Sequence, residues 1–100
     1  MSVINNLLSP QQIRESIAER FQRVRLNQNM TQVQLAERSG VSLGSLRRFE
    51  SEGEISLKNL VRLSIALNRA QDFDELFQIN EQIDLFKPEK KQRLRARGVR

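Results

Sequence analysis

The sequence predicts an all-α protein: a five-helix domain with a basic tail after it. Three observations support this prediction. First, apolar residues recur at helical spacing from residue 13 to residue 77. Second, four of the five expected helices begin at a serine or threonine that can cap them, and glycine or asparagine stands where helices end. Third, 100 residues are enough for one small core and too few for two.

The first two helices are predicted from their capping residues. The first starts near Ser9, whose hydroxyl can cap it while Gln12 closes a capping box, and it ends at the asparagines of residues 27–29. Its apolar stripe comprises Ile13, Ile17, Phe21 and Val24. The second helix starts at Thr31 with another capping box and ends at Gly40, where a left-handed residue is expected.

The third and fourth helices follow the same pattern. Ser42 caps the third helix, which runs to about Ser51, and Gly53 then breaks the chain. Ser56 caps the fourth helix. Apolar residues nearly encircle this fourth helix, so we expect it to be the most buried of the five.

The end of the domain is less regular. A fifth helix is expected over about residues 72–78, whose apolar side chains fall at helical spacing. Residues 82–86 alternate polar and apolar side chains, which favours a short strand. Ile83 and Phe86 also share a helical face with Ile79, so a helical reading stays open.

These elements divide the chain into four segments. Residues 1–8 form an N-terminal extension, and residues 9–80 form the helical domain. Residues 81–87 are apolar enough to act as a dimerisation segment. Residues 88–100 lack a packed pattern and form a flexible basic tail.

The composition excludes several functions. The chain has no cysteine, histidine, tyrosine or tryptophan, so it can form neither a disulfide nor an imidazole base, and it lacks the usual zinc ligands. Its carboxylates are scattered over expected helix surfaces and turns, where they suit helix dipoles better than an acid–base pair. We therefore expect no enzyme, no cofactor and no metal.

The sequence also bears on location. No apolar run approaches the roughly 18 residues that a membrane span needs. The first residues lack the basic flank and the cleavage site of a secretory signal. Together with the lack of cysteine, these features predict a cytoplasmic protein with no membrane partner.

The positive charge is concentrated at one end. The chain carries a net charge of +5, of which residues 87–100 contribute +6. Such a tail suggests a polyanionic partner, and a solvated chain end explains it equally well.

Residues 31–50, TQVQLAERSGVSLGSLRRFE, combine two short helices with a sharp turn. Gly40 permits the left-handed conformation that the turn needs, and Val41 can plug the space between the helices. Ala36 is small enough for close packing of one helix on the other. The segment therefore fits a helix-turn-helix.

This segment resembles the helix-turn-helix of the phage repressor/Cro (Xre) family. The residues that carry the resemblance are Thr31, Gln32, Leu35, Ala36, Gly40, Val41, Ser42, Leu46 and Glu50. It extends over about residues 13–78 and includes Arg25. It implies a five-helix repressor-like domain that places its third helix in the major groove of double-stranded operator DNA.

The resemblance also implies which residues contact DNA. The base-contacting positions are Ser42, Leu43, Gly44, Arg47 and Arg48. The phosphate-contacting positions are Thr31, Gln32, Lys58 and Asn59. Either arginine could bind guanine through two hydrogen bonds, or both could form a solvated face that touches only phosphates. Leu43 and Gly44 depart from the longer polar side chains usual at these positions, which leaves open how many bases are read directly.

Two further features follow from the resemblance. Arg25 and Glu50 correspond to an ion pair that links the first helix to the third. Members of the family usually bind palindromic sites as two-fold dimers. The end of the domain carries more apolar surface than its core needs, so we expect a homodimer whose interface comprises Phe77, Ile79, Ile83, Leu85 and Phe86.

Residues 47–50, 53–57 and 73–77, with the basic tail, are similar to a narrower group, the HipB-like DNA-binding antitoxins. This similarity implies an autorepressor that also binds a HipA-type kinase toxin. Two alternatives stay open: a stand-alone phage- or element-borne regulator without a toxin, and a protein-interaction module that has lost DNA binding.

Overall fold

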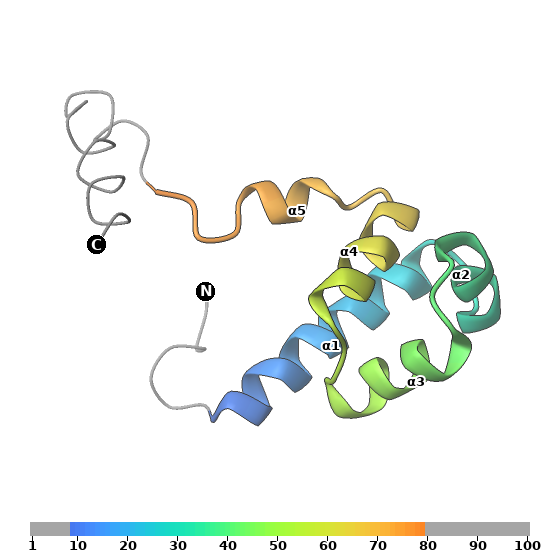
Figure 1. Ribbon diagram of the computed structural model, residues 1–100, viewed down its shortest axis with the longest axis horizontal. Coiled ribbons are helices and arrows are strands. Elements are labelled where there is room, and N and C mark those ends of the chain that lie inside the picture. The colour runs from blue at the N-terminus through green and yellow to red at the C-terminus, as the bar shows by residue number, and fades with distance from the viewer. Residues whose placement is uncertain (1–8, 80–100) are drawn as a thin grey trace.

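The computed structural model describes residues 9–79, which form an all-α domain and contain no strand. Its five helices are α1 (Pro10–Asn27), α2 (Gln32–Ser39), α3 (Leu43–Glu52), α4 (Leu57–Ala66) and α5 (Gln71–Asp74). Helix α3 packs on the long helix α1 and on α2, and α2 also packs on α4 (Figure 1). The predicted all-α fold is thus confirmed.

Each of the first four helices begins at the hydroxyl residue that the sequence predicts. Ser9 Oγ accepts a hydrogen bond of 3.1 Å from the Gln12 amide, and the Gln12 side chain accepts one of 2.9 Å from the Ser9 amide. Thr31 starts α2 with the same reciprocal pair of hydrogen bonds. Ser42 and Ser56 cap α3 and α4 through their hydroxyls. Local side-chain chemistry therefore fixes where these helices start.

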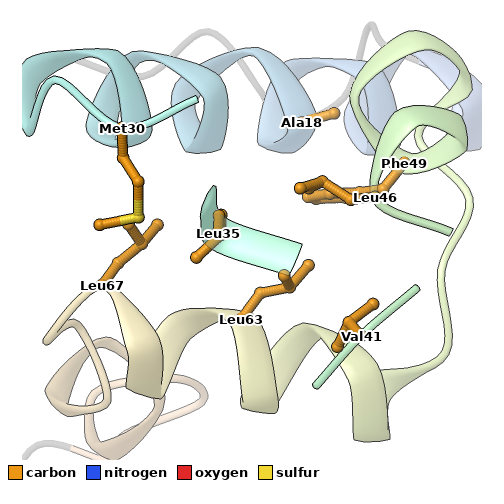
Figure 2. Packing of buried hydrophobic residues seen from close by; sticks show 8 residues of the cluster. All are labelled: Ala18, Met30, Leu35, Val41, Leu46, Phe49, Leu63 and Leu67. Carbon is orange, nitrogen blue, oxygen red and sulfur yellow. The ribbon is translucent and has the colours of Figure 1, made fainter. Parts of the chain in front are cut away.

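The core lies where α1, α2, α3 and α4 meet. It consists of Ala18, Met30, Leu35, Val41, Leu46, Phe49, Leu63 and Leu67. Figure 2 shows Leu35 of α2 in the middle of these side chains, and Leu35 is fully buried. The rings of Phe21 and Phe49 add an edge-to-face contact between α1 and α3, with centroids 5.2 Å apart. This core fixes the orientation of α3, the helix predicted to bind DNA.

Two glycines end the helices of the predicted motif. Gly40 follows α2 with φ 77° and Gly53 follows α3 with φ 75°, and both values lie in the left-handed region. Val41 comes directly after the first turn and is buried between the helices, as the sequence predicts. Gly53 also lies against α1, because a Cβ there would sit 3.0 Å from the carbonyl carbon of Arg14. The turns therefore set both the angle between α2 and α3 and the approach of α3 to α1.

Helix α4 has a larger share of buried and half-buried residues than any other helix of residues 9–79, as expected, although Leu57 and Ile65 are 66% and 57% exposed. The expectation about the fifth helix is wrong. Helix α5 is shorter than residues 72–78, because no side chain caps its start and Phe77 has a left-handed φ of 60°.

Several predictions fall outside the described residues. These are the N-terminal extension 1–8, the strand or helix at 82–86, the dimerisation segment 81–87 and the basic tail 88–100. They remain predictions from the sequence.

Candidate nucleic-acid interface

Helix α3 presents one face to the core and the opposite face to the surface. Leu46 and Phe49 are buried on the inner face. Among the predicted base-contacting residues, Ser42, Gly44, Arg47 and Arg48 are exposed and Leu43 is half-buried. Helical geometry places residues 44, 47 and 48 on one side of α3. Three of the five positions expected to read DNA are therefore brought together on the outer face of α3.

The two adjacent arginines differ in their contacts. Arg48 Nη2 lies 2.7 Å from Glu54 Oε1, and its Nε lies 3.3 Å from Glu52 Oε1. Both contacts are at the surface, where the Arg48 side chain is 62% exposed. Arg47 is exposed and makes no ion pair within residues 9–79. Arg47 is therefore free to bind an external anion or base, whereas Arg48 must share or exchange its acidic partners.

Gly44 leaves the surface of α3 open at its first turn. A Cβ at this position would meet no atom within 4 Å, so the packing of the domain does not require glycine here. Glycine costs a helix about 1 kcal/mol relative to alanine. The folded domain alone thus gives no reason for this residue, and the missing side chain would let a ligand approach the backbone closely.

The start of α2 carries the first pair of residues that the sequence predicts to contact phosphate. Thr31 is exposed, and its hydroxyl caps the helix. The side chain of Gln32 donates a hydrogen bond of 2.9 Å to Glu50. No hydrogen bond inside the described region uses the backbone amides of Gln32 and Val33. These amides carry partial positive charge and can bind an anion.

The second predicted phosphate site lies at the start of α4. Lys58 is exposed and has no ion pair among residues 9–79, and Asn59 is half-buried. A shallow surface hollow of about 310 Å³ connects this site to α3, since both Asn59 and Arg48 line it. The fold therefore brings one predicted phosphate ligand and one predicted base ligand to the same hollow.

Arg25 and Glu50 form the buried ion pair that links α1 to α3. Arg25 Nε and Nη2 donate to the two carboxylate oxygens of Glu50 at 2.7 Å and 2.8 Å. Arg25 Nη1 donates to the carbonyl of Met30 at 2.8 Å. The side chains of Gln22 and Gln32 also donate to Glu50, at 3.2 Å and 2.9 Å. Glu50 thus accepts hydrogen bonds from α1 and α2 and holds α3 against both.

The sequence does not reveal the contribution of the two glutamines to this network. Gln22 is 28 residues from Glu50, and Gln32 is 18 residues from it. One signal was present: Gln22 stands three residues before Arg25, on the same side of α1. That spacing alone does not distinguish a buried hydrogen-bond donor from a solvated side chain.

The predicted dimer residues are only partly within the described region. Phe77 is 91% exposed and Ile79 is 47% exposed. Ile83, Leu85 and Phe86 lie outside the described residues. The described part of the segment therefore presents apolar side chains at the surface.

The remaining groups do not form a metal site or a membrane span in the described part of the chain. Residues 9–79 contain no cluster of three or more metal-ligating side chains. None of their helices is both long enough and apolar enough to cross a membrane.

The arrangement of α2, a glycine turn and α3 with an exposed basic face defines a helix-turn-helix domain, a class that binds DNA. Comparison with known protein families agrees: residues 21–70, half of the chain, match the family described as Helix-turn-helix. The chain therefore belongs to the helix-turn-helix family and is a DNA-binding transcription regulator. The match lies within residues 13–78, over which the sequence resembles Xre-type repressors. A search of curated proteins finds no match to the chain.

Proposed function

We propose that the chain is a transcriptional repressor that binds a palindromic operator as a homodimer, with α3 in the major groove. The observation that carries this proposal is Arg47: it is exposed on the outer face of α3 and has no ion pair within the described residues. An unpaired guanidinium on this face can donate two parallel hydrogen bonds to guanine O6 and N7. Such contacts give about 1–3 kcal/mol of discrimination between bases.

The surrounding groups would position α3 on the duplex. The free amides at the start of α2 and the exposed Lys58 on α4 would bind phosphates on either side of the bases that α3 reads. The open surface at Gly44 would allow the first turn of α3 to approach the base edges. These contacts divide the interface into phosphate positioning and base recognition.

The basic tail and the apolar segment complete the proposal. Within this scheme, residues 9–80 are the DNA-binding domain, residues 81–87 contribute to the dimer, and residues 88–100 run along the DNA backbone. Each phosphate that the tail neutralises would steepen the salt dependence of binding by about 0.9 log unit per log unit of salt. A regulator of this kind acts on cellular DNA, so we place it in the cytoplasm.

A more specific role, the autoregulating antitoxin of a HipA-type kinase toxin, rests on the narrower sequence similarity alone. Its test is co-purification with the product of the adjacent gene. Recovery of a stable complex supports the antitoxin role. If the two proteins purify separately after co-expression, the stand-alone regulator is favoured.

One observation favours a second candidate, a protein-interaction module that has lost DNA binding. Glu52 and Glu54 both contact Arg48 and place two carboxylates beside the outer face of α3. Carboxylates repel phosphates, and they would suit a basic protein partner. DNA binding and protein binding through this face therefore need to be distinguished by experiment.

The decisive experiment is DNA selection from a random library with the purified full-length chain, followed by gel shift. Wild type is compared with Arg47→Ala and with Arg23→Ala. Arg23 is a matched control because it is also an exposed arginine on a helix, paired with Glu19 at 3.2 Å. We expect wild type and Arg23→Ala to select the same palindrome, and Arg47→Ala to lose preference at one position of each half-site. Failure of wild type to enrich any sequence would contradict the proposal and favour the interaction module.

A further inference from the structure

An apolar groove lies on the side of the domain where α1 and α4 meet the segment that contains α5. Its volume is about 350 Å³. The groove is lined mainly by Ile17, Phe21, Val24, Leu60, Leu67 and Phe73. In Figure 1 α5 follows α4 and extends away from it, and the residues that line the groove come from α1, α4 and the segment that contains α5. It is separate from the outer face of α3, because no residue of α3 lines it.

A protruding apolar side chain stands directly beside this groove. Leu76 lines the groove, and the next residue, Phe77, is 91% exposed. Phe77 also has a left-handed φ of 60°, which is uncommon for a bulky residue. Backbone strain at an exposed aromatic residue points to a functional role, and we therefore looked for the surface that Phe77 contacts.

The groove of the same protomer does not hold this ring. Its 91% exposure means that the ring makes almost no contact with the described part of its own chain. The left-handed bend at Phe77 follows directly after Leu76, which itself forms part of the groove wall. The ring and the groove are thus adjacent on one surface, with the ring outside the groove.

Charges around the two features are complementary. Arg69 and Asp72 also line the groove, and they pair with each other at 3.0 Å. Glu75 is exposed next to Phe77, and Arg20 lines the groove. Within residues 9–79, neither side chain takes part in an ion pair. A second copy of the chain, rotated by a two-fold axis, could bring Glu75 of one copy to Arg20 of the other.

We propose that two copies of the chain form a reciprocal dimer in which Phe77 of each copy fills the groove of the other. A surface that carries both a protrusion and a matching groove is self-complementary, which is the requirement for a two-fold interface. This inference rests on the proposed homodimer and specifies which surfaces form it. It also explains the exposure of Leu76, Phe77 and Ile79.

The test uses two variants of the full-length chain that damage opposite halves of the contact. Phe77→Ala removes the protruding ring and leaves the groove intact. Ile17→Lys introduces a charge into the groove at a position that is 39% exposed and leaves the ring intact. Ile65→Ala is the control, because Ile65 is 57% exposed but does not line the groove.

Sedimentation equilibrium measures the dissociation constant of the dimer for each chain and for mixtures. We expect Phe77→Ala and Ile17→Lys each to weaken self-association by about 10- to 100-fold, as loss of a buried aromatic or aliphatic contact predicts, and Ile65→Ala to leave it unchanged. An equimolar mixture of Phe77→Ala and Ile17→Lys should associate more tightly than either variant alone. Only the mixed dimer restores one complete ring-in-groove contact.

Three outcomes would overturn this inference. A mixture that associates no better than its components excludes the reciprocal contact. If the two variants keep the sedimentation mass of the wild type but lose thermal stability, the groove is filled by a segment of the same chain. A wild-type chain that stays monomeric removes the dimer altogether. Gel shift on a single half-site then separates the two parts of the proposed function, because a monomer can still bind DNA through α3 but cannot be the proposed homodimer.

Discussion

The inner and outer faces of α3 each carry an arginine–glutamate ion pair whose closest contact is 2.7 Å. On the inner face, the side chains of Arg25 and Glu50 are 6% and 3% exposed. At the outer face, those of Arg48 and Glu54 are 62% and 48% exposed. Distance alone therefore does not distinguish the two pairs, and burial does.

The difference in burial gives the two pairs different roles. The buried carboxylate of Glu50 receives hydrogen bonds from α1 and α2, so breaking the pair would leave a charge without a partner in the interior. Water competes for the exposed pair, which makes it weak and easily exchanged for another anion. The inner face of α3 fixes its orientation, and the outer face stays available for a ligand.

The largest effect should come from breaking the inner pair with Glu50→Ala. This variant leaves the guanidinium of Arg25 buried with only the carbonyl of Met30 as partner. Removing one member of a buried pair costs about 3–5 kcal/mol. We expect urea denaturation to show a loss of that size in the free energy of unfolding.

The matched control is Glu54→Ala, which breaks the exposed pair and should cost no more than about 1 kcal/mol. Equal losses in the two variants would mean that burial does not distinguish the pairs.

Gly53 also fixes the position of the inner face, because it ends α3 in close contact with α1, and Gly53→Ala tests this contact. Gly53 has φ 75°, and an added Cβ would lie 3.0 Å from the carbonyl carbon of Arg14 and 3.1 Å from the amide of Glu15. We therefore expect Gly53→Ala to lower the free energy of unfolding for two reasons. Left-handed strain costs about 1–2 kcal/mol, and overpacking against the backbone adds about 1–3 kcal/mol.

Gly40→Ala separates the two causes of this loss. Gly40 has φ 77° and open space around the added Cβ, so it should show the strain alone. Thermal melting of both variants checks this: Gly53→Ala should melt at the lower temperature. Melting temperatures that coincide would show that α3 tolerates a shift away from α1.

The sequence predicts those parts of the fold that depend on local chemistry. The starts of α1 to α4 follow from Ser9, Thr31, Ser42 and Ser56, since a hydroxyl next to an apolar periodic run can cap a helix wherever it occurs. The turns after α2 and α3 follow from Gly40 and Gly53, since glycine adopts the left-handed conformation that these turns need. The family of the chain also follows, because the turn and its flanking apolar residues have fixed spacing.

The sequence fails where the answer depends on distant segments. The exposure of Leu57 and Ile65 depends on which face of α4 meets α2, and a helix rich in apolar residues does not show this. The hydrogen bond from the Gln32 side chain to Glu50, 18 residues later, is not evident from the sequence, and the predicted phosphate contact of Gln32 stays a prediction. The division of roles between Arg47 and Arg48 depends on Glu54, which reaches back to α3 from the following turn.

On the outer face, Gly44→Ala should separate stability from DNA binding. The added methyl meets no atom within 4 Å, so we expect the free energy of unfolding to rise by about 0.5–1 kcal/mol. If the backbone of α3 approaches the bases, the same methyl should weaken operator binding about tenfold, which corresponds to about 1.4 kcal/mol. Urea denaturation and gel shift on one preparation measure both. A more stable protein with unchanged affinity would show that α3 does not approach DNA at this position.

The smallest effect is expected from Glu54→Gln, which keeps the shape of the side chain and removes its charge from the outer pair. Since an exposed pair contributes about 0.2–1 kcal/mol, the free energy of unfolding should change by no more than that. Operator affinity at low salt should rise by about two- to fivefold, because Arg48 no longer has to exchange a carboxylate for a phosphate and one repulsive charge is gone.

Glu19→Gln is the control for this substitution, because Glu19 forms a similar exposed pair with Arg23 on α1 and should leave the affinity unchanged. A fall in operator affinity for Glu54→Gln would reverse the interpretation of the outer pair. Glu54 would then hold Arg48 in the orientation that binds DNA, and the exposed pair, like the buried one, would serve to fix geometry.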